Sequence, residues 1–515
     1  MKKYISLAVL SLAMLPVAAQ ETYENAKLVG EDLNGTARYV GMGGAMEALG
    51  ADISTISTNP AGIGMFRKSS ANLSFGMVSQ EDAKSFASGH KTNMSFDQIG
   101  LVYAARTGEN SYINFAFNYH KNKNFNYILS AADNLYNASQ NKLTYAKAKA
   151  GLLFEGNGAG APNFDRANIQ CNQLDDIYAR NLLYDQNTNT WYYDEANSYT
   201  MDRSHTGYIG EYDFNMSGNI NNRVYLGLTI GLYDVNYKHY GEYVEQLPGN
   251  YWIRVADDRK ISGGGADVKF GMIIRPVETS PFRIGLSVAT PTWYDLSTSN
   301  YTTLTDESGS ASNHENYDYR LNTPWKFGLS LGHTIGNSIA LGASYEYADY
   351  GHLDSRYKTG EHYNWWYDDY TETSESDEPM NRHTAATLKG VSTIKLGAEL
   401  KPVPEMAVRF GYNYITPMYE KNGFKDGTIN SAGSYYSSAT DYTNWEGTNR
   451  ITCGLGYQMG NLKLDAAYQY QVRNGNFEPF MSYTDANDAA DDNIADIVKV
   501  NNKRHQVLLT LTYTF

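Results

Sequence analysis

The last nine residues of the chain limit its possible folds more than any other stretch. From Val507 to Phe515, apolar side chains alternate with threonines, and Leu508 is the only exception. Side chains of a β-strand point alternately to its two faces, so this strand has one apolar face and one polar face. Such a strand fits either the core of a soluble sandwich or the wall of a membrane barrel with lipid on its apolar side.

The first nineteen residues are typical of a secretory signal peptide. Lys2 and Lys3 precede an apolar run at 5–15, and Val17-Ala18-Ala19 is a small-residue cleavage site. We therefore expect cleavage near Ala19-Gln20 and an exported mature chain. No later apolar run reaches the ~18 residues of a membrane-spanning helix, which leaves a soluble exported protein or a barrel.

The composition favours the barrel. Tyr (44) and Gly (46) are abundant, Pro (13) is scarce, and no linker divides the chain. Polar lumen faces and aromatic girdles give outer-membrane barrels this character. The net charge of −14 argues against a nucleic-acid partner, which needs clustered Lys and Arg.

No cofactor or metal site is expected from the sequence. The two cysteines, Cys171 in a long loop and Cys453 in a strand, are in settings that disfavour a disulfide. One acidic run lacks the spacing and the glycine of a calcium-binding loop, so we interpret it as a solvated loop. That run contains Asp485, Asp488, Asp491, Asp492 and Asp496.

Fourteen alternating segments recur between residues 71 and 515, an even number, as bacterial single-chain barrels require. The expected strands are 71–79, 97–106, 111–120, 205–218, 223–239, 266–275, 282–290, 323–332, 338–349, 393–401, 406–416, 447–459, 462–472 and 505–515. In several of them charged residues alternate with apolar ones; these charges are Lys395, Glu399, Arg409, Lys463 and Asp465. These charges should face the lumen, because a Lys or Arg at the bilayer midplane costs roughly 2–4 kcal/mol.

The connections between these strands alternate in length. The short ones are turns rich in Gly, Asn and Pro, at 107–110, 219–222, 276–281, 333–337, 402–405 and 460–461. The long ones are polar segments, interpreted as loops, at 121–204, 240–265, 291–322, 350–392, 417–446 and 473–504. Short periplasmic turns and long extracellular loops are typical of a transmembrane β-barrel.

Residues 20–70 precede the first strand and differ from the rest. Eight glycines lie between Gly30 and Gly64, mixed with small apolar residues. Taken alone, the sequences at 41–44 and 59–62 are only turn chemistry, since Pro60 fixes φ and Asn59 can bond its own backbone. A glycine-rich segment in this position starts in the periplasm or folds into the lumen as a plug.

The combination of these features resembles the amino-terminal hatch of the FadL/TodX-like outer-membrane transporters. The matching residues are Gly35, Arg38, Asp52, Asn59, Pro60, Ala61 and Gly62. Weaker similarities are Thr290-Pro291, Thr323-Pro324-Trp325 and Thr416-Pro417, whereas the insertions at 121–204 and 350–392 depart from the family pattern.

The resemblance implies an all-β, fourteen-stranded antiparallel transmembrane barrel with a hatch in its lumen. It also implies passive uptake of long-chain fatty acids or other hydrophobic molecules, with lateral release through the wall near a kinked strand. We therefore expect a signal peptide at 1–19, a hatch at 20–70 and a barrel at 71–515.

Several side chains are candidates for specific roles. Arg38 is expected to anchor the plug or to meet a ligand carboxylate. Two inward cations, Arg409 and Lys463, are ligand contacts or part of an ordinary charge ladder. The aromatic residues Tyr363, Trp365, Trp366, Tyr367 and Tyr370 form an extracellular capture surface or pack within their loop.

At the end of the chain, Tyr513 and Phe515 belong to the periplasmic aromatic girdle. The terminal Phe also resembles the signal that the barrel-assembly machinery reads. The expected partners are a hydrophobic small molecule, outer-membrane lipid and lipopolysaccharide of a Gram-negative cell, and the barrel is expected to be a monomer.

Three other functions stay open. A hydrophilic substrate-specific porin would have an open lumen, which a plug opposes. An outer-membrane hydrolase would need a nucleophile, a base and an acid in order, and the ten His show no such signature. A surface receptor or adhesin would use the large loops.

Overall fold

The structure is a computed structural model of the 515-residue chain. It describes residues 21–149, 154–155, 163–164, 173–179, 182–185, 187–188, 190–364, 369–426, 429, 431, 439, 441–484, 490 and 492–515. The expected signal peptide, Cys171 and the acids Asp485, Asp488 and Asp491 lie outside these residues.

The elements in chain order are α1 (Thr22–Leu28), α2 (Ala37–Gly41), η1 (Ile53–Ile56), η2 (Pro60–Met65), β1 (Ser70–Gln80), β2 (Thr92–Arg106), β3 (Tyr112–Asn124), β4 (Tyr127–Asn134), α3 (Gln140–Lys149), β5 (Phe154–Glu155), β6 (Asn163–Phe164), α4 (Gln173–Tyr178), β7 (Leu183–Asp185), β8 (Thr190–Tyr192), β9 (Ser198–Ile220), β10 (Val224–Gln246), η4 (Pro248–Asn250), β11 (Trp252–Ile274), β12 (Arg283–Ala289), β13 (Trp293–Asp306), β14 (Gly309–Asn322), β15 (Lys326–Ile335), β16 (Ile339–Asp349), η5 (Tyr350–His352), β17 (Asp354–Asn364), β18 (Asp369–Ser376), α5 (Glu378–Thr387), β19 (Gly390–Val403), β20 (Met406–Ile415), β21 (Tyr442–Met459), β22 (Leu462–Glu478) and β23 (Val498–Thr514).

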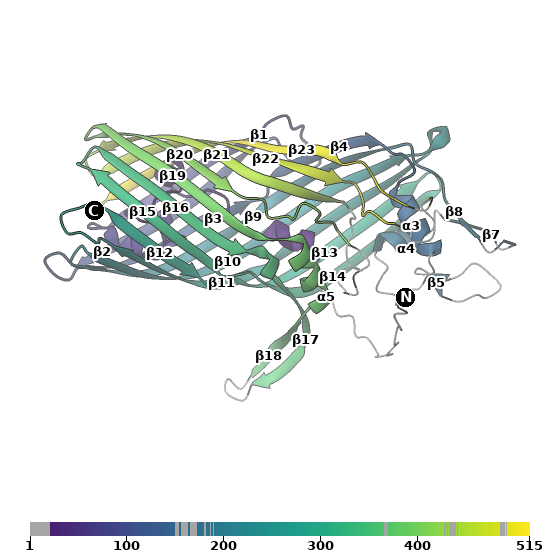
Figure 1. Ribbon diagram of the computed structural model, residues 1–515, viewed down its shortest axis with the longest axis horizontal. Helices are drawn as coiled ribbons and strands as arrows, with labels where there is room; N and C mark the ends of the chain where they lie inside the picture. Colours follow the sequence, from purple (N-terminus) through teal and green to yellow (C-terminus); the bar gives the residue numbers. More distant parts are fainter. Residues whose placement is uncertain are drawn as a thin grey trace, which may run out of the picture.

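Fourteen of these strands close an antiparallel ring (Figure 1). Their order around the ring is β1, β2, β3, β9, β10, β11, β12, β15, β16, β19, β20, β21, β22 and β23. β1 then pairs with β23 in register from Ser70 opposite Thr514 to Gln80 opposite Arg504. The predicted fourteen-stranded antiparallel barrel is therefore confirmed, and each of the fourteen predicted segments corresponds to one strand of the ring.

All six predicted short turns lie at one end of the barrel, which we call the short-turn end. The opposite end, which carries α3, α4 and α5, is the loop end (Figure 1). Asn221 and Asn222 both have positive φ (51° and 57°), as a tight turn between two twisted strands demands. Gly460 has a φ of 58° in the turn between β21 and β22.

The outer surface carries an apolar band next to the short-turn end. On β10 the outward residues Leu228, Ile230 and Leu232 are 44–49% exposed, and the next outward residues are Asp234, Asn236 and Lys238. This change marks where the strand leaves an apolar surrounding and enters a polar one. A lipid-embedded barrel has such a band, so these strands span a membrane.

The predicted loops at 240–265 and 291–322 are wrong, because most of their residues are strand. β10 and β11 are paired along all 23 residues, well beyond the apolar band, and η4 joins them. β13 pairs with the outer half of β11 and with β14. The barrel wall therefore continues outside the membrane, with β17 and β18 projecting from its side (Figure 1).

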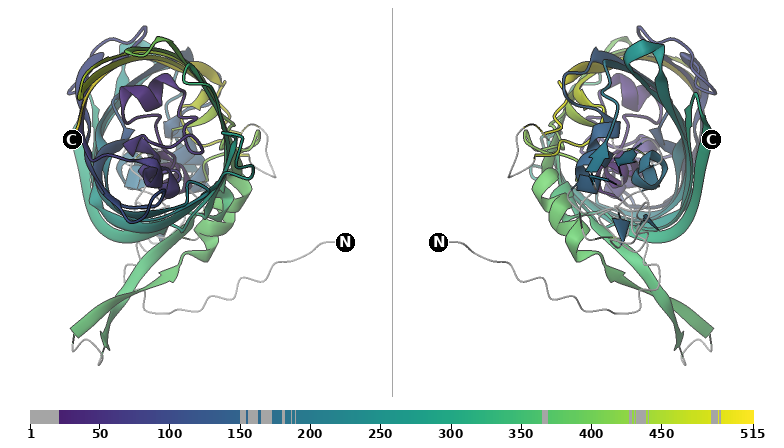
Figure 2. Two further views of the ribbon diagram at one scale, coloured as in Figure 1. Left: turned by 90° about the vertical axis from the view of Figure 1, so that its left-hand side faces the viewer. Right: turned by 90° about the vertical axis from the view of Figure 1, so that its right-hand side faces the viewer.

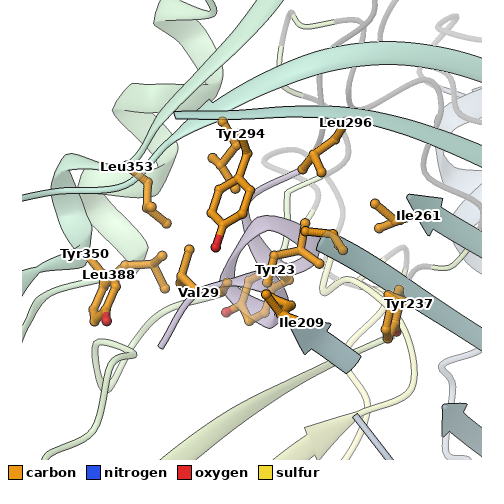
Figure 3. Packing of buried hydrophobic residues seen from close by; sticks show 14 of the residues in the cluster. Tyr23, Val29, Ile209, Tyr237, Ile261, Tyr294, Leu296, Tyr350, Leu353 and Leu388 are labelled. Atoms are coloured by element: carbon orange, nitrogen blue, oxygen red, sulfur yellow. The ribbon is translucent and has the colours of Figure 1, made fainter. Parts of the chain in front are cut away.

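Among the described residues, no helix has the combination of length and apolarity needed to cross a membrane. The largest buried apolar cluster lies inside the loop-end half of the barrel, where α1 meets inward residues of the wall (Figure 3). Tyr23 and Val29 contribute from the chain before β1, and Ile209, Tyr237 and Ile261 contribute from β9, β10 and β11. The lumen is thus filled partly by the start of the chain.

Candidate functional site: the filled lumen

Residues 21–66, which we call the luminal segment, lie inside the ring of strands (Figure 2). The segment starts at the loop end, where the Thr22 hydroxyl lies 2.9 Å from the Thr384 hydroxyl of α5. It ends at the short-turn end, where β1 begins. α2 contacts β20, β21, β22 and β23, whereas η2 contacts β3, β9, β10 and β11 on the opposite wall.

The Asn-Pro-Ala turn is seated directly on the wall. Asn59 caps η2 by accepting a hydrogen bond from the Ala61 backbone N–H (3.2 Å), and Pro60 occupies the first helical position. A Cβ atom on Gly227 of β10 would lie 2.3 Å from the Pro60 carbonyl carbon, and one on Gly271 would lie 2.1 Å from Asn59 Oδ1. These two wall positions tolerate only glycine while the turn is in place.

Asp52 joins two parts of the luminal segment, and within the described residues it makes no hydrogen bond or ion pair with the wall. Its carboxylate accepts hydrogen bonds from the Thr36 hydroxyl (2.8 Å) and from the Ser54 backbone N–H (3.1 Å). Gly35, with φ of 136°, lets the chain pass close to Ser54, since a Cβ there would lie 2.4 Å from Ser54 Oγ. The segment is therefore folded on itself as well as docked.

The three cations predicted to face the lumen lie in one ion-pair cluster. Glu399 pairs with Arg38 Nε (3.0 Å) and Arg409 Nε (2.6 Å). Asp465 pairs with Arg409 Nη1 (2.7 Å) and Lys463 Nζ (3.1 Å). Arg38 also donates to the Ala51 carbonyl (2.9 Å). Two protein carboxylates therefore pair with all three cations, and Arg38 links the luminal segment to β19.

A second buried ion-pair cluster lies further along the luminal segment. Lys395 Nζ contacts Glu47 (2.8 Å) and Glu346 (2.6 Å), and the Ser344 hydroxyl donates to Glu47. Burial raises the pKa of the Glu47 carboxyl above its usual value, although Lys395 opposes the shift. Lys395 was expected to point inward, but its two acidic partners were not found from the sequence.

At the loop end, Glu24 of α1 is the anchor. Its carboxylate, 3% exposed, pairs with Arg259 of β11 (2.9 Å) and with Lys27 (2.8 Å). Burial alone would raise its pKa, but Arg259, Lys27 and Lys425 outweigh burial and hold the pKa well below the usual range. Sequence reasoning missed Glu24, because nothing in its neighbourhood separates it from an ordinary helix residue.

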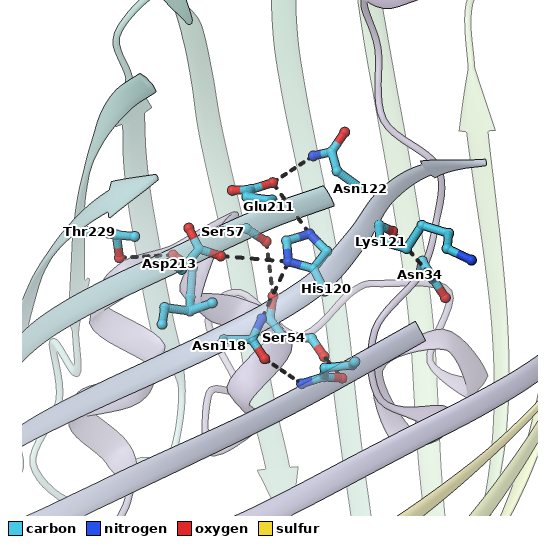
Figure 4. A network of polar contacts seen from close by, with 12 residues as sticks. Asn34, Ser54, Ser57, Asn118, His120, Lys121, Asn122, Glu211, Asp213 and Thr229 are labelled. Atoms are coloured by element: carbon cyan, nitrogen blue, oxygen red, sulfur yellow. Dashed lines mark hydrogen bonds and ion pairs between the residues drawn. The ribbon is translucent and has the colours of Figure 1, made fainter. Parts of the chain in front are cut away.

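A polar network surrounds His120 on the inner wall (Figure 4). His120 lies 3.4 Å from Glu211 and 3.6 Å from Asp213 on β9, close enough for the three to share a cation. Lys269 already occupies that position, with its Nζ 2.6 Å from Glu211, 3.4 Å from Asp213 and 2.8 Å from Asp267. The group is accordingly an ion-pair network that ties β9 to β11.

Two adjoining cavities lie between the luminal segment and the loop-end wall, with volumes of about 160 and 170 Å³. Both are lined by Val29 and Asp32 of the segment and by Arg450 and Arg473 of the wall. A third cavity, of about 470 Å³, lies at the short-turn end beside Arg38. For comparison, an apolar cavity of about 150 Å³ admits one benzene ring.

The wall is interrupted at two neighbouring positions. Pro291 separates β12 from β13, and Pro324 separates β14 from β15. Two hydrogen bonds bridge the interruption: the Thr292 backbone N–H donates to Thr323 Oγ1 (2.8 Å), and the Thr323 backbone N–H donates to the Thr292 carbonyl (3.1 Å). Trp293 and Trp325 are about half exposed on the outer surface there, and a cavity of about 40 Å³ lies inside. Two of the three Thr-Pro similarities in the sequence, Thr290-Pro291 and Thr323-Pro324, occur here, whereas Thr416-Pro417 follows β20.

The predicted capture surface is described only in part. Tyr363 is 45% exposed at the end of β17, opposite Tyr370 of β18. Trp365, Trp366 and Tyr367 lie outside the described residues. At the other end of the chain, Tyr513 and Phe515 are 46% and 65% exposed at the short-turn end, with their rings 5.2 Å apart.

Comparisons with known proteins find similar solved structures but no matching family model and no matching curated protein. The CymD monoaromatic hydrocarbon channel is 10% identical to this chain, with a TM-score of 0.48 over 94% of this chain and 99% of the other. The toluene transporter TbuX of Ralstonia pickettii gives the same TM-score and coverage at 12% identity. A FadL homologue of Pseudomonas aeruginosa gives them at 13% identity.

Proposed function

We propose that this protein is an outer-membrane channel for the passive uptake of hydrophobic small molecules, with the luminal segment as its hatch. The observation that carries the proposal is the seating of residues 21–66 inside a closed fourteen-stranded barrel. Long-chain fatty acids or similar compounds are the proposed cargo. The mature chain, cleaved near Ala19-Gln20, acts as a monomer in a Gram-negative outer membrane.

The filled lumen favours a hydrophobic cargo over a hydrophilic one. A porin passes small polar solutes through an open, water-filled lumen. Here the segment packs against opposite walls through the Asn59 turn and the Arg38–Glu399 pair. An apolar molecule gains about 25 cal/mol per Å² of surface that it buries, so it leaves water for the apolar surfaces that line part of these cavities.

Lateral release is proposed at the Pro291 and Pro324 interruption. Both prolines lack the N–H that would continue the hydrogen-bond ladder, so adjacent strands are weakened at one level. The cavity behind them is bounded by Val29 and Gly30 of the luminal segment. Movement of that segment would therefore open a path from the lumen to the lipid, which Trp293 and Trp325 border.

The proposal assigns roles to the termini and the projecting hairpin. Tyr363, Trp365, Trp366, Tyr367 and Tyr370 are the proposed capture surface. Tyr513 and Phe515, exposed beside the closing strand pair, are the proposed signal for the barrel-assembly machinery. A surface receptor is the second candidate, favoured by the β17–β18 hairpin that projects from the wall (Figure 1).

The test is deletion of residues 21–66 from the mature protein, with the barrel strands intact. Single-channel conductance in planar bilayers should rise from a low value to that of an open pore. Fluorescent fatty acids of different structure should enter an outer-membrane preparation at more similar rates after the deletion than before it. A large conductance in the undeleted protein would contradict the hatch, and normal uptake with the Pro291–Pro324 region cross-linked would contradict lateral release.

A further inference from the structure

The cavity of about 170 Å³ at the loop end, which we call the cationic cavity, has an uneven charge. Its lining includes six basic side chains: Lys27, Lys123, Arg203, Arg450, Arg473 and Arg504. Only two acidic side chains, Asp32 and Asp441, line the same space. A site for an uncharged hydrocarbon alone would not need this excess.

Two of the six cations pair closely with carboxylates other than Asp32. Lys27 pairs with Glu24 (2.8 Å), and Arg203 makes a bidentate pair with Asp441 (2.7 and 2.8 Å). Lys123, Arg450, Arg473 and Arg504 then remain around Asp32. Burial lowers the pKa of Lys123 to about 7, so the three guanidinium groups carry the excess charge. Burial opposes ionisation of Asp32, but Arg504 and Arg450 outweigh it and lower the pKa of this carboxyl, so it is charged and can offset one of them.

Hydrogen bonds to neutral groups fix Lys123, Arg450 and Arg504, and among the carboxylates of the described residues the two arginines pair only with Asp32, which they share. Arg450 lies 3.2 Å from Asp32 and also donates to Asn413 (3.1 Å) and Gln471 (2.8 Å). Arg504 donates to the backbone carbonyls of Asn124 and Asn126 (3.3 and 3.0 Å), and its Nη1 lies 3.9 Å from Asp32 Oδ2. Lys123 donates to the Val29 carbonyl.

Arg473 is the cation with the least compensation. Its guanidinium lies 5.0 Å from the centre of the Trp445 ring, and its Nε atom is buried without a hydrogen-bond partner. Within the described residues, no carboxylate forms an ion pair with it. The nearby Glu446, which borders the adjoining cavity, is exposed and is not within ion-pair distance.

Aromatic rings form the other walls of the cationic cavity. Tyr23 stacks on Tyr419 with ring centres 5.3 Å apart, and Tyr442 lies 5.0 Å from Tyr23. Tyr127 meets Trp445 edge to face at 5.6 Å. The space therefore combines flat apolar surfaces with a cationic region.

We propose that the cationic cavity binds an organic anion whose head group carries two negative charges and whose body is a flat ring. This deepens the proposed function, on which it rests, by naming the class of ligand held at the loop end. Like charges gathered away from water repel, and an anion removes that repulsion while pairing the free guanidinium. The rings hold the apolar part of the same molecule.

Phenyl phosphate, benzoate and toluene form a suitable probe series, because they share one ring and carry about two, one and no negative charges. Binding to the purified, full-length mature protein is measured by calorimetry at about pH 8, where the phosphate monoester is doubly ionised. Phenyl phosphate is expected to bind about tenfold or more tightly than benzoate, and toluene weakest of the three. Inorganic phosphate should compete with phenyl phosphate.

Arg473→Gln tests the site directly. Binding of phenyl phosphate should weaken about tenfold or more, whereas the thermal stability of the ligand-free protein should stay equal or rise, because the side chain pairs with no carboxylate. Arg254→Gln is the matched control. Arg254 also lies over a tryptophan (Trp252, 6.0 Å) and also has a buried, unpartnered Nε, but it lies outside the cationic cavity. Its substitution should leave binding unchanged.

Equal affinity for phenyl phosphate and toluene, or unchanged binding in Arg473→Gln, would overturn the inference. A large loss of stability in ligand-free Arg473→Gln would also overturn it, since the arginine would then be structural. These failures are distinct from failure of the channel function. If the anion does not bind but fatty-acid uptake depends on the luminal segment, the proposed function stands alone.

Discussion

Single glycines of the barrel wall decide how closely the luminal segment is seated. Gly227 of β10 faces inward against the Asn-Pro-Ala turn, and an added methyl group would lie 2.5 Å from the Ala61 nitrogen. Backbone atoms cannot rotate away as a flexible side chain does. The wall and the turn therefore fit each other only while this position has no side chain.

Gly227→Ala should loosen the luminal segment without breaking the barrel. Overpacking of this kind costs about 1–3 kcal/mol, and the strain falls on the contact between the turn and the wall. Single-channel recordings should show more frequent openings, while the heat-resistant mobility of the folded barrel on gels is kept. Gly218→Ala on the neighbouring β9 is the control, because an added methyl there meets nothing within 4 Å. Equal behaviour of the two variants would contradict this interpretation.

The sequence predicted which charged side chains point into the lumen better than it predicted their ion-pair partners. The alternation of apolar and charged residues placed Lys395 and Arg409 inside the lumen, and both are buried there. Their partners Glu399, Asp465 and Glu47 come from other strands or from the luminal segment. Such pairs depend on strand register and on the docked path of the segment, neither of which local sequence encodes. Ligand contact by Arg38, Arg409 and Lys463 stays a prediction.

At the scale of elements, strands were predictable where lipid covers them and unpredictable where water does. Outward residues must be apolar only within the membrane, which produces the alternation seen in β19 and β23. In β13 the outward residues include Asp295 and Ser297, and the inward residues include Thr298 and Asn300. From Ser297 to Thr303 both faces are mainly polar, so the segment resembled a loop although it is paired on both sides.

The helix α1 should be released from the wall by acid. Glu24 has a lowered pKa when docked, so docking favours its ionised form. Its contribution is complete above the ordinary value of 4.5 and is lost progressively as the pH falls below that value. Amide hydrogen exchange of residues 22–28, corrected for intrinsic rates, should be slow at pH 7 and 5.5 and faster at about pH 3.5.

Glu24→Gln should weaken protection of α1 already at neutral pH and flatten its pH dependence, because the variant has no proton to gain. Glu405→Gln is the control, since Glu405 is an exposed residue of the turn between β19 and β20. Acid-independent exchange in the unsubstituted protein would show that Glu24 does not hold the helix.

At the scale of the whole molecule, the one exception to the alternation in the terminal strand, Leu508, connects closure of the barrel with docking of the luminal segment. Leu508 interrupts the run of polar inward residues in β23, and it is fully buried in a cluster with Ala37 and Val40 of α2. The strand that closes the ring thus also carries an apolar contact for the luminal segment. Thr510 on the same face accepts a hydrogen bond from the Ala37 backbone N–H (2.7 Å). Closure of the barrel and docking of the segment share one strand.

This shared strand leads to a prediction about the intact barrel. Arg67 and Lys68 are exposed between the luminal segment and β1, so a specific protease site inserted after Lys68 should be cut in the folded protein. The released fragment should stay bound, because ion pairs and hydrogen bonds hold it from Glu24 at the loop end to Pro60 at the short-turn end. Native mass spectrometry should give the mass of the uncut mature protein plus one water, and heating in detergent should separate two chains.

Cutting the same site placed in the exposed turn at Glu307-Ser308, between β13 and β14, should likewise leave one species, which controls for the effect of cutting the chain itself. Loss of the fragment only from the first variant, without heating, would mean that the covalent link to β1 holds the segment and that its contacts with the wall do not.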